Sequence, residues 1–283
     1  MKEIANDFDH SKSTIKQILN ENDIFHFEKT SACLFTAEHK QNRVFFCNRF
    51  IHVPYRNLPF IIFTDESSVS IDPGRVGVWR RRGFHPQGSF AETPQKQVTL
   101  MVWGAIGPRG FRTPLIKVDG NINAYKYVET LAREGILRII QQEFGTHFVW
   151  MQDNAPSHAA KLTRDTLFRF IPQVLDWPPR SPDLNPIENL WDILKDRLGN
   201  DVYENEDQLF ARLKYEWEHI PAEIVHECYS AFLARCIVCA RHNGETLSGK
   251  WNEVHVEHNK YRTKLVQIQA NTQNGLITKF IEQ

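Results

Sequence analysis

The chain has 283 residues, of which 41% are hydrophobic and 24% are charged, and its 34 basic side chains balance 34 acidic ones. These values are typical of a globular protein with one or two domains, and without an apolar run of about eighteen residues no membrane span is predicted. A nucleic-acid-binding protein usually has a basic excess, so any such surface here is expected to be a local patch. Five scattered cysteines and an N-terminus without signal-peptide features indicate an intracellular protein with reduced thiols.

Residues 1–28 are predicted to form two short helices separated by a polar turn. The second helix is capped by Ser11 or Ser13. Their apolar faces are marked by Ile4, Ala5, Phe8, Ile15, Ile18 and Leu19. The pair is either part of a DNA-reading unit or two helices that pack on the rest of the chain.

Residues 29–58 are predicted to form a helix and a connector with few acidic residues. The basic side chains and histidines of this segment are His39, Lys40, Arg43, Arg49, His52 and Arg56. Such a face either follows the phosphates of a nucleic acid or belongs to a solvated, charged helix.

From residue 60 the pattern changes to strands bounded by Gly or Pro, followed by a long helical segment. The predicted strands lie in FIIFTDE (60–66), SSVSID (67–72), GVWRRRG (77–83), QVTLMVWGAIG (97–107) and FRTPLIKVDG (111–120), and the helical segment covers residues 123–145. Asp65 is placed at the end of the first strand. With the segments that follow, the order is three strands, helix, strand, helix, strand, helix.

A short apolar run at residues 148–151 is predicted to be a buried strand, because Asn154 and Pro156 end it. Asp153 then lies at or just beyond the carboxyl end of that strand, where open α/β sheets usually carry their chemistry.

The prolines of residues 178–186 predict an extended loop that leads into a helix. We expect Asn185 to be the N-cap and Pro186 the first helical residue, with Glu188 in the first turn. The buried face of this helix is predicted to consist of Ile187, Leu190, Trp191, Leu194 and Leu198. Glu188, Asp192 and Lys195 lie on the other face.

Two motifs in this region, QDNAPSH (152–158) and SPDLNPIENLW (181–191), resemble the catalytic core of the mariner superfamily of cut-and-paste DNA transposases. Thirty-four residues separate Asp153 from Glu188, which is the spacing of the Glu-using branch of that family. Asp65 in FIIFTDES supplies the earlier aspartate. The resemblance implies an α/β, ribonuclease H-like mixed sheet with flanking helices, preceded by a partial helix-turn-helix and followed by C-terminal helices.

The resemblance also implies the activity, which is metal-dependent cleavage of DNA strands and their transfer to a new site. Asp65, Asp153 and Glu188 would be the catalytic carboxylates and would hold two Mg²⁺ (or Mn²⁺) ions, which stabilise the attacking and leaving oxygens. The implied partners are double-stranded DNA at transposon ends and target, and a second copy of the chain as a homodimer on paired ends. No membrane is involved, and the implied location is the nucleus of a eukaryote or otherwise the cytoplasm.

Several further residues are predicted to contact DNA. The recognition helix would present Ser13, Thr14 and Lys16, and a basic hairpin beside Trp79 would present Arg80, Arg81 and Arg82. His158 either bonds a phosphate or orders its own loop, and Lys195 either meets phosphate or is solvated. Since the family carries more DNA-binding sequence before this segment, we expect weak, salt-dependent binding with little sequence preference.

Several alternatives remain open at this stage. Glu188 could close a capping box with Asn185, which would leave Asp192 as the third ligand. The chain could be a decayed or host-adopted transposase that only binds DNA or protein, or a nuclease of the same fold with another substrate.

The predicted domains are 1–28 (partial helix-turn-helix), 29–58 (basic linker), 59–200 (catalytic) and 201–283 (C-terminal helical extension and tail). In the last of these, residues 206–220 and 221–244 are predicted to be two helices. Cys236 and Cys239 with His242 form one isolated pair of cysteines in an apolar run, which favours buried packing over a zinc site.

Overall fold

The computed structural model describes residues 35–53, 58–71 and 98–262, apart from residues 121, 134, 168, 172, 200, 202 and 261. The predicted helix-turn-helix with Ser13, Thr14 and Lys16 lies outside the described residues. The predicted basic hairpin with Arg80, Arg81 and Arg82 also lies outside them. These predictions therefore stay predictions.

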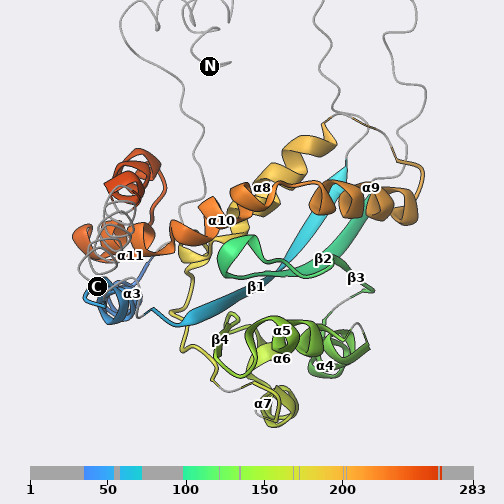
Figure 1. Ribbon diagram of the computed structural model, residues 1–283, viewed down its shortest axis with the longest axis horizontal. Coiled ribbons are helices and arrows are strands. Elements are labelled where there is room, and N and C mark those ends of the chain that lie inside the picture. The colour runs from blue at the N-terminus through green and yellow to red at the C-terminus, as the bar shows by residue number, and fades with distance from the viewer. Residues whose placement is uncertain are drawn as a thin grey trace, which may run out of the picture. The chain divides into compact units, whose positions relative to one another are not determined.

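A four-stranded mixed sheet forms the centre of the described structure, with strand order β3-β2-β1-β4 (Figure 1). Its strands are β1 (Phe60–Ile71), β2 (Val98–Ile106), β3 (Ile116–Val118) and β4 (Phe148–Met151). β2 runs antiparallel to both of its neighbours, and β4 runs parallel to β1. β1 and β4 are therefore the one parallel pair of this sheet, and Asp65 and Asp153 follow the last residues of that pairing.

β1 differs from the prediction because the segments 60–66 and 67–72 join into one strand. Asp65 thus lies inside β1 and not at its end. The reason is that β1 has two partners of different length, since β4 pairs with only residues 60–63 while β2 continues to Ile71. Asp65 still lies just beyond the parallel pairing, and this is the position that matters for a site at the sheet edge.

The last strand of the predicted order, which precedes the final helix, is reduced to a single parallel bridge between Trp150 and Val174. Trp150 accepts a backbone bond from Leu175 and donates one to Gln173. Pro178 and Pro179 follow shortly afterwards and have no N–H group, so the segment cannot extend far as a strand.

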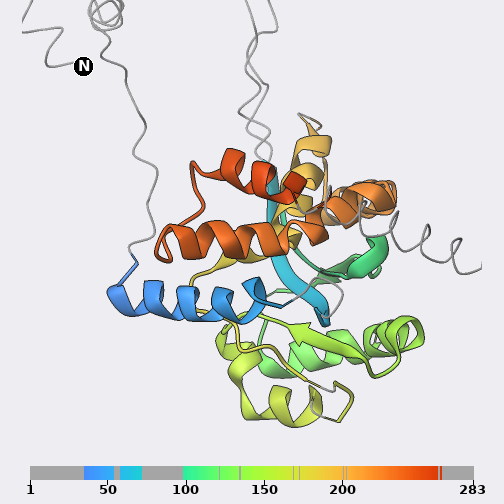
Figure 2. The same ribbon diagram turned by 60° about the vertical axis from the view of Figure 1, so that its left-hand side comes forward.

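Helices cover both faces of the sheet (Figures 1 and 2). One face packs against α4 (Ala124–Arg133), α5 (Ile136–Phe144), α6 (Pro156–Ala159) and α7 (Lys161–Leu167). The predicted long helix over 123–145 is two helices, because Gly135 adopts the left-handed conformation with φ of 62° and interrupts it. Ile62, Trp103 and Trp150 are sheet residues buried on this face.

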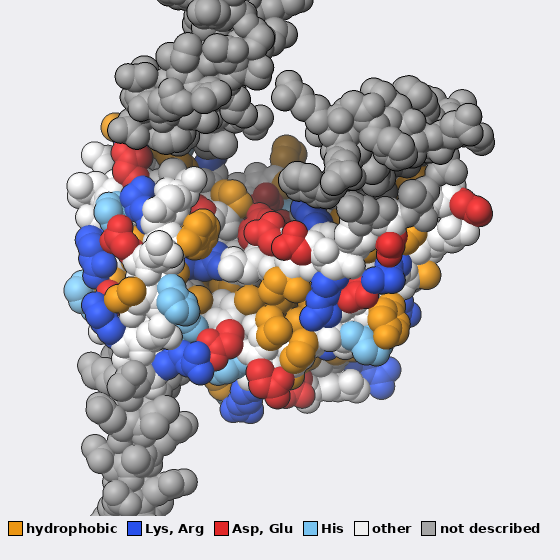
Figure 3. All heavy atoms as spheres, turned by 90° about the horizontal axis from the view of Figure 1, so that it is seen from above, with side chains coloured by type: hydrophobic (Ala, Val, Ile, Leu, Met, Phe, Trp, Pro, Cys, Tyr) orange, Lys and Arg blue, Asp and Glu red, His pale blue; other side chains and the backbone are white. Residues whose placement is uncertain are grey.

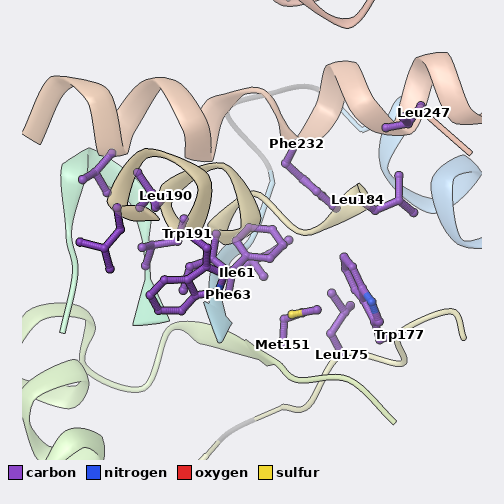
Figure 4. Packing of buried hydrophobic residues seen from close by; sticks show 14 of the residues in the cluster. Ile61, Phe63, Met151, Leu175, Trp177, Leu184, Leu190, Trp191, Phe232 and Leu247 are labelled. Atoms are coloured by element: carbon purple, nitrogen blue, oxygen red, sulfur yellow. The ribbon is translucent and has the colours of Figure 1, made fainter. Parts of the chain in front are cut away.

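The other face carries the larger core. Its helices are α8 (Ile187–Leu198), α9 (Glu206–Glu218), α10 (Ala222–Ser230) and α11 (Phe232–Arg241), with short 3₁₀ turns η3 (Pro108–Gly110) and η4 (Pro182–Leu184) and a further helix at residues 251–260. The predicted helix over 221–244 is thus two helices, which meet at Ala231. Figure 4 shows the rings of Phe63, Trp177 and Phe232 in this core.

The predicted helix of the basic segment is α3 (Ala37–Ile51), which lies beside α11 (Figure 2). Phe46, Cys47 and Phe50 fix α3 to the larger core. Arg43 is fully buried and Lys40 pairs with Glu245. These two basic side chains therefore do not belong to an open face that could follow phosphates.

Acidic, basic and apolar side chains are interspersed over the described part of the face in Figure 3. This mixture fits the zero net charge of the chain.

Candidate active site

Asp65 and Asp153 lie at matching positions on the two parallel strands. The last residues paired between β1 and β4 are Phe63 and Met151. Asp65 lies two residues after Phe63, and Asp153 lies two residues after Met151. Side chains two residues apart in an extended strand point to the same face. Both carboxylates therefore point toward the face covered by α8.

Gly104 makes room for this arrangement. It pairs with Asp65 across the antiparallel ladder, so a side chain at 104 would share the face of Asp65. A Cβ atom built there would lie 2.9 Å from Trp191 of α8. The glycine therefore lets α8 approach the sheet closely beside the carboxylate.

Glu188 is brought to the sheet by the loop that precedes α8. The Asn185 side chain donates to the backbone oxygen of Thr64 at 3.3 Å and accepts from the N–H of Ile187 at 3.4 Å. The helix begins at Ile187 with Pro186 as its N-cap, one residue later than predicted. Asn185 nevertheless caps the first turn through its side chain and fastens this turn to the residue before Asp65.

The three carboxylates line one cleft of about 460 Å³, whose walls include Met151 and residues 153–155 and 177–182. Glu188 is half-buried, whereas Asp192 is exposed one turn further along α8 and does not line the cleft. The predicted buried face of α8 is confirmed, since Ile187, Leu190, Trp191, Leu194 and Leu198 are all buried. This rotation of the helix favours Glu188 over Asp192 as the third carboxylate.

Two of the carboxyl groups are held in an environment that disfavours their charge. Burial raises the pKa of Asp65 well above its usual value, and the negative charges of Glu188, Glu66 and Asp153 add to the rise. Burial also raises the pKa of Glu188, against the effect of a hydrogen bond with Asp65 and the nearby charge of Lys195. A cation in the cleft would relieve this concentration of negative charge.

Asp153 is in a different environment because His158 neutralises it. Its Oδ1 lies 2.6 Å from Nδ1 of His158 and accepts the N–H of Ala155 at 2.9 Å. The bond with His158 lowers the pKa of Asp153. Nε2 of His158 lies 3.2 Å from Glu66 on the neighbouring strand. His158 thus bridges two carboxylates from β1 and from the end of β4.

The histidine is buried, with 4% of its surface exposed, and packs on the ring of Tyr127. Burial lowers its pKa, but the bonds to Asp153 and Glu66 outweigh this effect and raise the pKa to about 10. The imidazolium is therefore charged at neutral pH. This geometry favours the loop-ordering role for His158, one of the two roles that the sequence left open.

The donor set fits a hard divalent cation, because the cleft offers carboxylate oxygens of Asp65, Asp153 and Glu188. Within the part of the chain that the structure describes, no three such ligands are already gathered around one point. The hydrogen bonds of Asp153 with Ala155 and His158 both fall on its Oδ1 atom. Its Oδ2 is the oxygen left for a metal ion.

Two buried arginines hold the loop that carries Glu188. Arg43 of α3 forms two bonds of 2.7 Å with the carboxylate of Asp183. Arg235 of α11 donates to the backbone oxygens of Asp183 and Asn185 and to the side chain of Asn189. The start of α8 is therefore fixed from β1 and from two other helices.

The remaining predicted residues lie outside this cluster. Lys195 is exposed on α8, on the same side as Glu188. Cys236 and Cys239 are buried in the core, and His242 bonds Glu253. Glu66, Arg43 and Arg235 also belong to the site and were not predicted from the sequence. Only Glu66 had a signal, because adjacent acids on a strand point to opposite faces.

The comparisons with known proteins agree with this geometry. The family model described as "DDE superfamily endonuclease" matches residues 60–210. The Tc1 transposase of Caenorhabditis elegans is 32% identical over 65% of this chain and 68% of its own length. The Tc3 transposase of the same organism is 29% identical over 84% of this chain and 72% of its own length. The chain thus spans about two thirds to three quarters of the length of these two relatives.

Solved structures show the same fold. A paired-end complex of Mos1 transposase matches with a TM-score of 0.66 and 21% identity, covering 87% of this chain and 74% of that one. The catalytic domain of Mos1 mariner transposase matches with a TM-score of 0.58 and 20% identity, covering 76% of this chain and 98% of that one. The expected ribonuclease H-like fold is confirmed.

The fold and the acidic cleft define a metal-dependent DNA endonuclease. The chain belongs to the DDE superfamily endonucleases, within the Tc1/mariner family of transposases. None of the helices in the described residues is long and apolar enough to cross a membrane.

Proposed function

We propose that this protein is a DNA transposase in which Asp65, Asp153 and Glu188 hold divalent ions, Mg²⁺ or Mn²⁺, for strand cleavage and strand transfer. The observation that carries the proposal is the convergence of these carboxylates from β1, β4 and α8 on one cleft. The raised pKa of Asp65, caused by burial and by the neighbouring acids, supports a site built for cations.

The chain's own residues position the reacting groups. Asp65 and Asp153 are fixed by the register of β1 and β4, and Glu188 is fixed by the bonds of Asn185 to Thr64 and of Arg235 to the loop. His158 holds Asp153 through its Nδ1 atom. Bound divalent ions would stabilise the charge that develops on the attacking and leaving oxygens of the phosphodiester.

The partners are proposed from the relatives. The matching solved structures include Mos1 paired-end complexes with a transposon end, with Mg and with Mn. We infer that this chain likewise acts on double-stranded DNA at transposon ends as a homodimer, in the nucleus of its host. Lys195 is near enough to the carboxylates to act on the pKa of Glu188, which supports a phosphate contact beside the cleft.

The test is cleavage of supercoiled plasmid and of linear duplex by purified full-length protein with Mg²⁺ or Mn²⁺. We expect D65N, D153N and E188Q to reduce nicking to background while DNA binding persists. D192N is the matched control, because it removes an acid from the same helix outside the cleft. Normal nicking by D153N would refute the assignment. If wild-type protein bound metal and nicked neither substrate, a non-enzymatic, host-adopted protein would be the better description.

A further inference from the structure

A second hollow adjoins the catalytic cleft between α3 and the loop that follows Val174. It has a volume of about 280 Å³. Its walls are Asn42, Phe45, Phe46, Arg49, Asn154, Asp176, Trp177, Pro178 and Pro179. Four of these, Asn154 and residues 177–179, also line the catalytic cleft. The hollow and the cleft are therefore neighbours that share one wall.

The α3 side of the hollow is a stripe of three exposed side chains. Asn42, Phe45 and Arg49 are spaced by three and four residues and therefore share one face of the helix. Phe45 exposes 71% of its surface, although the neighbouring Phe46 and Phe50 are buried in the core. The core does not use this ring, so its position at the mouth of the hollow needs another explanation.

The hollow has firm walls. The ring of Phe46 packs on Trp177 with centroids 5.0 Å apart, which fastens α3 to the loop. The Asn154 side chain donates to the backbone oxygen of Trp177 at 2.8 Å and fastens the end of β4 to the same loop. The site is therefore preformed, as ligand sites usually are.

Charge divides the hollow into two ends. Arg49 is exposed and makes no ion pair with the described residues. Asp176 is also exposed and lines the hollow from the loop that follows Val174. An anionic group is thus favoured near Arg49, and a hydrogen-bond donor is favoured near Asp176.

We propose that this hollow binds one unpaired nucleotide of the DNA strand next to the scissile phosphate. The base stacks on Phe45, its phosphate pairs with Arg49, and an amino group of the base donates to Asp176. This inference rests on the proposed function, because it takes the neighbouring cleft to be where the strand is cut.

The exposed ring, the basic side chain, the volume and the carboxylate of the hollow all fit an unpaired nucleotide. An exposed aromatic ring beside a basic side chain is the usual platform for single-stranded nucleic acid. A volume of about 280 Å³ is slightly below the range of about 300–1,000 Å³ that holds a drug-sized ligand, so it suits a single base and not a duplex. Carboxylates accept from the exocyclic amine of cytosine, and thymine lacks such an amine. The site should therefore prefer cytosine or adenine over thymine.

The test compares two probes, a blunt fluorescent duplex and the same duplex with a short unpaired extension that contains 2-aminopurine. Binding is measured by anisotropy with Ca²⁺ in place of Mg²⁺, and stacking is measured by quenching of 2-aminopurine. Wild-type protein should bind the extended probe more tightly than the blunt one. F45A should lose about tenfold of affinity for the extended probe, equivalent to roughly 1.4 kcal/mol, and keep its affinity for the blunt probe.

The matched variants separate this role from general effects. F45Y should keep the quenching of 2-aminopurine. R49A should weaken binding of the extended probe more than R49K does. Y215A removes an exposed ring on α9, and R138A removes an exposed charge on α5; both should behave like wild type. D176N should reduce the preference for cytosine over thymine in the extension. Equal losses of affinity for the extended probe in F45A and Y215A would overturn the proposal. So would an unchanged preference of F45A and R49A for the extended probe over the blunt one.

Plasmid nicking distinguishes this proposal from the proposed function. If wild-type protein nicks DNA while F45A and R49A show no change on either probe, only the nucleotide site fails. If wild-type protein binds both probes and never nicks DNA, the proposed function fails.

Discussion

Asp65 and Asp153 each lie two residues beyond the last paired residues of two neighbouring parallel strands. Their separation is therefore set by the spacing of strands in a sheet and not by a flexible loop. Gly104, opposite Asp65, lets Trp191 and hence α8 approach the same place. The third carboxylate depends on that approach.

We predict that G104A destabilises the protein and impairs cleavage. The added methyl group would lie 2.9 Å from Trp191, so α8 must shift. Overpacking of this kind costs about 1–3 kcal/mol, measurable by urea denaturation. W191F in the same chain should recover part of both losses, since its ring is smaller. Strictly additive effects of the two substitutions would contradict the contact.

Glu188 and Asp192 should differ sharply on substitution, although they lie one turn apart on one helix. E188Q removes a half-buried carboxylate from the cleft and should abolish nicking, whereas D192N should retain most of the activity. Calorimetric titration with Mn²⁺ should show weaker metal binding for E188Q alone. The reverse pattern would move the third ligand to Asp192.

The buried ion pair of Arg43 with Asp183 should make a large contribution to the stability of the fold. R43M leaves the Asp183 carboxylate without its main partner, and losing one member of a buried pair costs about 3–5 kcal/mol. The double variant R43M/D183N should be more stable than R43M, because it removes the uncompensated charge. Urea denaturation measures both. Equal stability of the single and double variants would show that the pair is not coupled.

The motifs of the sequence place each of the three carboxylates next to a recognisable strand end or helix start, and the structure brings all three to one cleft. The sequence pattern misplaced Asp65 within its strand, since the longer pairing of β1 with β2 depends on contacts distant in sequence. It also missed the breaks at Gly135 and Ala231. Arg43 and Arg235 resembled surface charges on helices, because nothing in a single sequence shows that an arginine is buried against a loop.

His158 should stabilise the fold over a defined pH range. Its pKa is raised to about 10 from an ordinary value near 6.5, so the stabilisation is fully present below about pH 6.5 and is lost as pH rises through about 10. H158Q should flatten the decline of melting temperature with pH in that range. It should also weaken cleavage, because Asp153 loses its partner. An unchanged profile would show that the ring is not charged.

Asp65 should couple metal binding to proton release. Its pKa is raised by burial and by Glu188, Glu66 and Asp153, so the metal-free fold favours the protonated acid. The contribution of this protonated acid to stability is therefore present below the unfolded pKa of about 3.8 and is lost as pH rises through the higher folded pKa. The metal-free protein should therefore become less stable as pH rises from the unfolded to the folded pKa of Asp65, and Mg²⁺ should restore the lost stability.

Because a ligand carboxyl must lose its proton before it binds a cation, affinity for Mn²⁺ should increase as pH rises through the raised pKa. Calorimetry in two buffers of different ionisation enthalpy measures the protons released. D65N is the control: it should release fewer protons, bind metal weakly, and make the metal-free protein more stable at neutral pH by roughly 0.5–2 kcal/mol. Metal binding that releases equal numbers of protons in wild-type protein and D65N would show that Asp65 is already ionised.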